Sequence, residues 1–158
     1  MAERAVAPIV GVTMMVLITV VLAALVGGMV FGVELDDPPE ASIAADATYN
    51  GTSGQTYVEL THLAGDTLDV GALTIRLSVD GERLEHQPPV PFFSATGFES
   101  GPTGPFNSGA SETTWEGGER AGLTIAGSND PVPQSGAEVT IRLFAEGYSV
   151  GTVQTTVR

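Results

Sequence analysis

The sequence predicts an N-terminal hydrophobic transmembrane or filament-core helix followed by an immunoglobulin-like β-sandwich, a mainly β fold. Two observations support this prediction. Residues 5–33 form an uncharged run of 29 residues, of which 22 are hydrophobic. The remainder of the chain alternates apolar and polar residues over short segments separated by turn residues. Because hydrophobic periodicity is the main sequence signal of secondary structure, the chain combines a membrane-length helix with a mainly β domain.

The hydrophobic run is longer than a secretory signal requires. A helix over residues 5–33 would be about 43 Å long, and a bilayer core of about 30 Å needs only about 20 apolar residues. The apolar part of a signal peptide usually has about 7 to 15 residues, so its length argues against removal by signal peptidase. Pro8 fits the first turn of a helix that begins near Ala5. A plain membrane anchor and a helix that joins a polymer are the remaining interpretations.

Small residues recur along one face of this helix. Ala24, Gly28 and Gly32 are spaced four residues apart, an arrangement that lets a second helix approach closely. The general frequency of glycine in membrane helices accounts for them equally well. We treat these three residues, with Pro8 and Gly11, as candidates for helix packing.

Charge is distributed unevenly along the chain, whose net charge is −13. After residue 33, 18 acidic residues are accompanied by five arginines, and the chain has neither lysine nor cysteine. Such a surface repels phosphate backbones, which excludes nucleic acid as a partner. This composition is typical of proteins from extreme halophiles, and an ordinary acidic extracellular domain is the alternative. Arg4 precedes the helix and Glu34 follows it, so the positive-inside tendency predicts a cytoplasmic N-terminus and an exported domain.

Residues 34–40 contain Pro38 and Pro39 and are expected to form a stiff hinge before an exported acidic domain at 41–158. The alternation of apolar and polar residues predicts a strand over 73–79, followed by a tight turn at Asp80 and Gly81. Further strands are predicted at 42–49, 56–63, 121–126, 139–143 and 149–157.

A glycine- and proline-rich stretch at 87–118 contains five large aromatic residues: Phe92, Phe93, Phe98, Phe106 and Trp115. Loops of this length are uncommon unless they are functional. The aromatic residues either form a contact surface or fold back onto the core. Exposed aromatic clusters are rare, so we expect packing, with Phe92 and Phe93 as the first candidates.

Asn50 begins the sequon Asn-Gly-Thr and is a candidate glycosylation site, although Asn-Gly is also a strong turn signal.

His62 is expected to be a structural hydrogen-bonding residue rather than a base. Asp66 and Asp69 flank a turn, which we interpret as a solvated acidic turn rather than a cation site. The sequence contains no nucleophile elbow, phosphate loop or zinc-protease motif, so we predict no catalytic residue, no metal site and no cofactor.

The segment Arg4–Gly27, RAVAPIVGVTMMVLITVVLAALVG, resembles the N-terminal segment of archaeal type IV pilins, specifically the haloarchaeal group. The Arg-Ala-Val-x-Pro start, Gly11 and the region of Thr19 coincide with the family pattern. In the exported domain, the sequence from His62 to Leu68 and the Trp115-Glu-Gly-Gly sequence also resemble elements of that group.

The resemblance implies that a membrane-embedded prepilin peptidase cuts between Arg4 and Ala5 and removes residues 1–4 as a leader. The helix at 5–33 stays attached, and a pilus assembly ATPase with its membrane platform packs it against other pilin copies. The chain would then be a structural subunit of an adhesion pilus, located in the membrane before assembly and outside the cell afterwards.

Two alternatives remain open on sequence. Archaellum subunits have a similar leader, although the Ala-Val-x-Pro start favours the pilus. A monomeric membrane-anchored binding domain could also carry a pilin-type leader. A polymer subunit requires cleavage and helix association, whereas an anchored receptor tolerates the loss of both.

Overall fold

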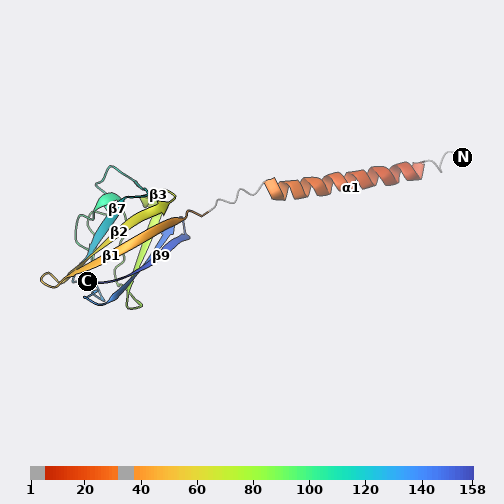
Figure 1. The fold of residues 1–158 in the computed structure, drawn as a ribbon. Helices are drawn as coiled ribbons and strands as arrows, with labels where there is room; N and C mark the ends of the chain where they lie inside the picture. Colours follow the sequence, from red (N-terminus) through yellow and green to blue (C-terminus); the bar gives the residue numbers. More distant parts are fainter. Residues whose placement is uncertain (1–5, 32–37) are drawn as a thin grey trace. The chain divides into compact units, whose positions relative to one another are not determined.

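The computed structural model describes residues 6–31 and 38–158, which belong to two compact units. The first contains the helix α1, Val6–Phe31, and the second is a β-sandwich that begins at Pro38 (Figure 1). The predicted fold class, an apolar helix followed by a β-sandwich, is confirmed. Most of the hinge predicted at 34–40 lies outside the described residues.

Helix α1 is apolar on all sides, with no acidic residue in its first turn and no basic residue in its last. Its segment Pro8–Met29 is long and apolar enough to cross a membrane. The hydroxyls of Thr13 and Thr19 donate to the carbonyls of Ile9 and Met15, at 2.8 and 2.7 Å. Both hydroxyls are therefore satisfied inside their own helix, as a nonaqueous environment demands.

The sandwich is built from two antiparallel sheets. The three-stranded sheet has the order β1-β2-β7, with strands at Ala41–Asn50, Gln55–Gly65 and Arg120–Ile125. The four-stranded sheet has the order β5-β4-β8-β9, with strands at Glu82–Arg83, Leu73–Val79, Glu138–Ala145 and Tyr148–Thr156. A short pair of β3, Leu68–Asp69, and β6, Thr114–Trp115, and the 3-10 turns η2, Val70–Ala72, and η3, Gly104–Phe106, complete the domain.

The six predicted strands correspond to β1, β2, β4, β7, β8 and β9, and their ends differ by at most two residues. The strands β3, β5 and β6 have two residues each, which is too short for periodicity to predict. The predicted turn at Asp80 and Gly81 connects β4 to β5. Both residues have positive φ, 50° and 84°, as a tight hairpin turn requires.

The two sheets meet where β1 lies beside the end of the chain. The Tyr49 amide donates to the Arg158 carbonyl at 2.8 Å, and the Arg158 amide donates to the Ala47 carbonyl at 3.0 Å. At the other end of β1, a Cβ on Gly151 would lie 3.6 Å from the Ala41 carbonyl oxygen. Strands β1 and β9 therefore run in the same direction as neighbours, each at the edge of its own sheet.

Four of the five aromatic residues of the 87–118 stretch are buried, and the expected packing is confirmed for them: Phe92, Phe98, Phe106 and Trp115. Phe106 meets the Trp115 ring edge-on at 5.3 Å between centroids. The prediction was wrong for Phe93, which is 61% exposed. Phe92 forms an isolated bridge with Asn107, in which its amide donates to the Phe106 carbonyl, and its side chain is buried while that of the next residue is exposed.

Alanine substitutions at Phe106, which is buried, and at Phe93, which is exposed, test whether the core is packed as described. We expect Phe106→Ala to lower the free energy of unfolding by about 3–5 kcal/mol, because it opens a cavity beside Trp115. Phe93→Ala, the matched control, should change it by less than about 0.5 kcal/mol. Urea unfolding followed by tryptophan fluorescence measures both. Equal losses in the two variants would contradict the core described here.

Candidate functional site

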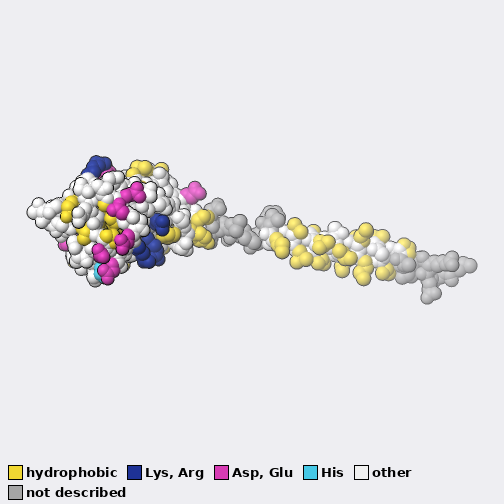
Figure 2. Space-filling model, turned by 90° about the horizontal axis from the view of Figure 1, so that it is seen from below, with side chains coloured by type: hydrophobic (Ala, Val, Ile, Leu, Met, Phe, Trp, Pro, Cys, Tyr) yellow, Lys and Arg dark blue, Asp and Glu magenta, His cyan; other side chains and the backbone are white. Residues whose placement is uncertain are grey.

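The surface of α1 is a candidate functional surface. Along Pro8–Met29 none of the helix is buried, and its large side chains are widely exposed, including Ile9 at 66% and Met29 at 76%. Figure 2 shows hydrophobic side chains along the helix. A helix that is apolar on all sides is stable only in lipid or against other apolar surfaces.

The predicted packing residues Pro8, Gly11, Ala24 and Gly28 are all exposed on α1. A Cβ added at Gly11 or Gly28 would meet no atom within 4 Å, so neither glycine is required by packing within the described residues. Ala24 and Gly28 lie one turn apart and leave a shallow place on the helix that a second backbone could approach. The candidate Gly32 lies outside the described residues.

The predicted cleavage residues Arg4 and Ala5 also lie outside the described residues. The first described residue of α1 is Val6, so the predicted cut would fall just before the helix. Cleavage at this position would leave the described helix whole.

Asn50 lies at the end of β1, at the tip of the β1–β2 hairpin, and is exposed. Its Oδ1 accepts hydrogen bonds from the amides of Thr52 and Ser53, at 3.0 and 3.3 Å, and its carbonyl accepts from the Gly54 amide at 2.8 Å. The turn role of Asn50 is thus confirmed. Its exposure at a hairpin tip is also the placement that a glycosylated asparagine needs.

His62 is fully buried, as a structural histidine is expected to be. Its Nδ1 lies 3.1 Å from the Trp115 carbonyl oxygen, so this nitrogen donates the hydrogen bond. Its ring centroid lies 5.4 Å from that of Trp115. The contact ties β2 to β6 across 53 residues of sequence, and sequence reasoning did not identify this partner.

The carboxylates of Asp66 and Asp69 accept hydrogen bonds from backbone amides. Asp66 Oδ2 accepts from the Glu40 amide at 3.0 Å, and Asp69 Oδ1 accepts from the Gly71 amide at 2.8 Å and caps η2. Within the part of the chain that the structure describes, no group of three histidine, aspartate or glutamate residues is arranged to hold a metal ion.

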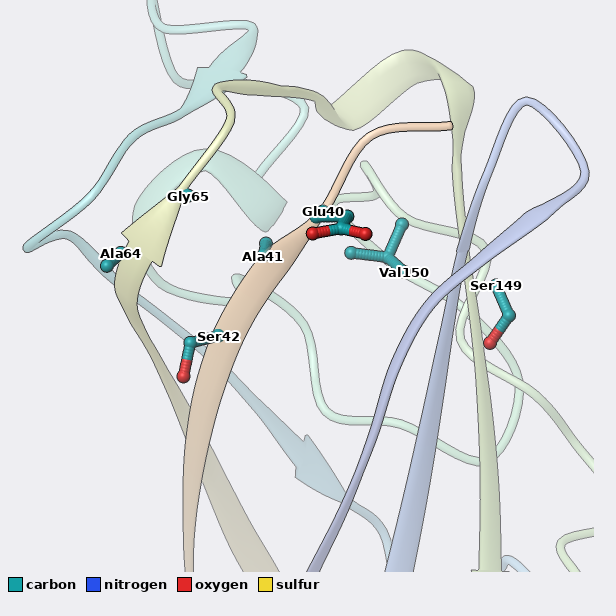
Figure 3. A pocket seen from close by; sticks show the side chains of 7 residues that line it. All are labelled: Glu40, Ala41, Ser42, Ala64, Gly65, Ser149 and Val150. Carbon is teal, nitrogen blue, oxygen red and sulfur yellow. The ribbon is translucent and has the colours of Figure 1, made fainter. Parts of the chain in front are cut away.

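An open hollow lies where β1 and β9 begin (Figure 3). It is lined by Glu40, Ala41, Ser42, Ala64, Gly65, Ser149 and Val150. Glu40 is the one titratable group among these residues, and the other side chains are small or apolar. The hollow therefore contains no paired acid and base that could perform catalysis.

Comparison with known proteins identifies the N-terminal part of the chain. Residues 4–47 match the family model described as the archaeal type IV pilin N-terminal segment. The match includes the predicted cleavage position, all of α1 and the first part of β1.

The chain is also 38% identical over 82 residues to an uncharacterized protein of Archaeoglobus fulgidus. The aligned part covers 52% of this chain and 56% of that protein, so the chain spans about half the length of the curated relative it matches.

Two solved structures show partial similarity in shape. The archaellum periplasmic stator protein FlaG of Sulfolobus acidocaldarius gives a TM-score of 0.42 at 17% identity, over 73% of this chain and 97% of that one. The archaeal flagellum of Methanospirillum hungatei gives a TM-score of 0.48 at 15% identity, over 96% of this chain and 91% of that one. Both TM-scores are below 0.5, so neither similarity identifies the topology of this domain.

The family match agrees with the resemblance found in the N-terminal sequence. It covers α1, whose apolar surface requires burial. Residues 4–47 are therefore similar to the N-terminal segment of archaeal type IV pilins.

Proposed function

We propose that this chain is a prepilin that is cut between Arg4 and Ala5 and assembled through α1 into an archaeal type IV pilus used for adhesion. The observation that carries the proposal is the uncovered apolar helix inside a segment that matches the family model. A prepilin peptidase, an assembly ATPase and a membrane platform are the partners that this route requires.

Assembly would move α1 from one nonaqueous environment to another. Before assembly the helix is buried in lipid, and afterwards it is buried among copies of itself. Association of apolar helices depends on close packing, because lipid tails are as apolar as the side chains themselves. The face with Ala24 and Gly28 supports such packing, because small residues let two backbones approach.

The distribution of charge supports a cytoplasmic N-terminus and an exported sandwich. Arg4 is the one basic residue before the helix, and the acidic residues of the chain are concentrated after it. An acidic surface without lysine also suits a domain that works in high salt. Adhesion is assigned to the exported domain, because the helix would be buried in the filament.

The N-terminus of the chain in sheared surface filaments tests this proposal. We expect mass spectrometry to find chains that start at Ala5 in filaments, and chains with the leader only in membranes. Chains confined to membranes and starting at Met1 or Ala2 would refute assembly and support an anchored binding domain.

Deletion of the gene should reduce adhesion and leave swimming intact. Loss of swimming would instead assign the chain to an archaellum.

Neighbouring glycines provide a matched test of the helix face. We expect Gly28→Leu to reduce the filament yield at least tenfold, because a leucine separates the packed backbones, while the chain still accumulates in the membrane. Gly27→Leu makes the same change about 100° around the helix and should reduce the yield much less. Leucine favours helix more than glycine, so helix loss cannot explain a defect. Equal yields from both variants would exclude this face from packing.

We further propose that Asn50 carries an N-linked glycan. Its exposed position on the hairpin tip supports this modification. The mass of the peptide that contains residue 50 should exceed its sequence mass in the native protein. Asn50→Gln and Thr52→Ala should remove the excess, whereas Thr52→Ser should retain it, because serine also completes a sequon. An unmodified native peptide would refute the proposal.

A further inference from the structure

Two arginines face each other on the outer surface of the four-stranded sheet. Arg76 of β4 lies directly opposite Arg142 of β8 in the register, and both side chains are exposed. Cross-strand neighbours have Cβ atoms about 5 Å apart, and like charges in this position destabilise a sheet. The pair is therefore unfavourable for the isolated domain.

No carboxylate of the described residues offsets this pair. The ion pairs in the described part of the chain use Arg120 and Arg158, and no acidic group there lies within 4.0 Å of either Arg76 or Arg142. The nearest positions on this face are neutral, namely Thr74, Ser78, Thr140, Thr152 and Gln154. Farther along, Arg83 lies opposite Ser78 and adds positive charge, and Glu138 lies near the start of β8. In a chain with net charge −13, the pair is a basic patch without a carboxylate partner among residues 6–31 and 38–158.

The three-stranded sheet carries the opposite arrangement. Asp46 of β1 lies directly opposite Glu59 of β2. Arg158 reaches Asp46 at 2.8 Å and Arg120 reaches Glu59 at 3.1 Å. The side chains of both arginines are exposed, at 80% and 68%, and exposed ion pairs of this kind contribute only about 0–1 kcal/mol. These carboxylates can therefore accept a second guanidinium or exchange the first.

Figure 2 shows one face of the molecule, on which arginine side chains form separate groups with carboxylates nearby. The two like-charged pairs lie on different sheets, and alternation along the strands turns all four side chains away from the core. A single copy therefore has an arginine pair on one sheet and, on the other, a carboxylate pair whose members already bind Arg158 and Arg120.

We propose that Arg76 and Arg142 of one copy dock onto Asp46 and Glu59 of a second copy of this chain. This inference rests on the proposed function, in which copies assemble into a filament. Each pair consists of cross-strand neighbours, so their spacing matches, and each guanidinium can bind one carboxylate through two hydrogen bonds. Charge complementarity selects the partner, because a second copy presents carboxylates at the spacing that the arginines have.

The contact uses two different surfaces of the same molecule. Such a contact is heterologous, and unless its rotation closes a ring it continues from copy to copy as a helical filament. It would fix how neighbouring sandwich domains follow one another, while α1 supplies the common core.

Charge reversal tests the pairing in the full chain, in cells grown at their normal salt concentration. Arg76→Glu with Arg142→Glu should reduce the yield of sheared filaments at least tenfold, and so should Asp46→Arg with Glu59→Arg. Coexpression of these two double variants should restore assembly, because each supplies the charge that the other needs. The chain with all four changes should also assemble.

Three controls keep the result interpretable. Arg76→Gln with Arg142→Gln removes the repulsion between the arginines, so it should fold normally and still assemble less well than the wild type. Gln134→Glu with Ser135→Glu adds negative charge at exposed positions outside both pairs and should leave the yield unchanged. Membrane levels of each variant report folding separately from assembly.

The outcomes separate this inference from the proposed function. Absence of the wild-type chain from filaments would refute the proposed function. If the wild type assembles and the charge variants assemble equally well, the docking is wrong and the proposed function remains. If the variants fail and coexpression does not restore them, the arginine pair binds another anion, and the pairing with Asp46 and Glu59 is refuted.

Discussion

The burial of α1 is the constraint on which the rest of the molecule depends. A helix that is apolar on all sides cannot remain in water, and the acidic sandwich cannot leave water. The helix and the sandwich therefore require different environments, one apolar and one aqueous. A bilayer and the interior of a polymer both meet this requirement. The match of residues 4–47 to the archaeal type IV pilin N-terminal model covers this helix.

Strand β1 connects this constraint to the folded domain. At its start, the Asp66 amide donates to the Glu40 carbonyl at 2.9 Å, and the Asp66 carboxylate accepts from the Glu40 amide. Gly65 has φ +117°, and a side chain there would collide with the Glu40 carbonyl. The start of β1 therefore packs directly against the backbone of Gly65. The start of β1 is therefore held in the sandwich by these contacts.

Most of the local structure could be predicted from the sequence, because it depends on local patterns. Composition predicts α1, and alternation predicts six strands almost to their ends. The error at Phe93 has a simple cause, since consecutive residues of an extended chain cannot both face one core. Contacts between distant segments could not be predicted. The opposition of Arg76 and Arg142 depends on the pairing of β4 with β8, which no pattern within either strand reveals. The same is true of His62 and Trp115.

The hydroxyls of Thr13 and Thr19 have a consequence for any transfer of α1 from one apolar environment to another. Each is bonded to a carbonyl one turn earlier in α1, so neither lipid nor a neighbouring helix has to supply a polar partner. Transfer of α1 between two apolar environments would therefore change neither of these two side-chain hydrogen bonds.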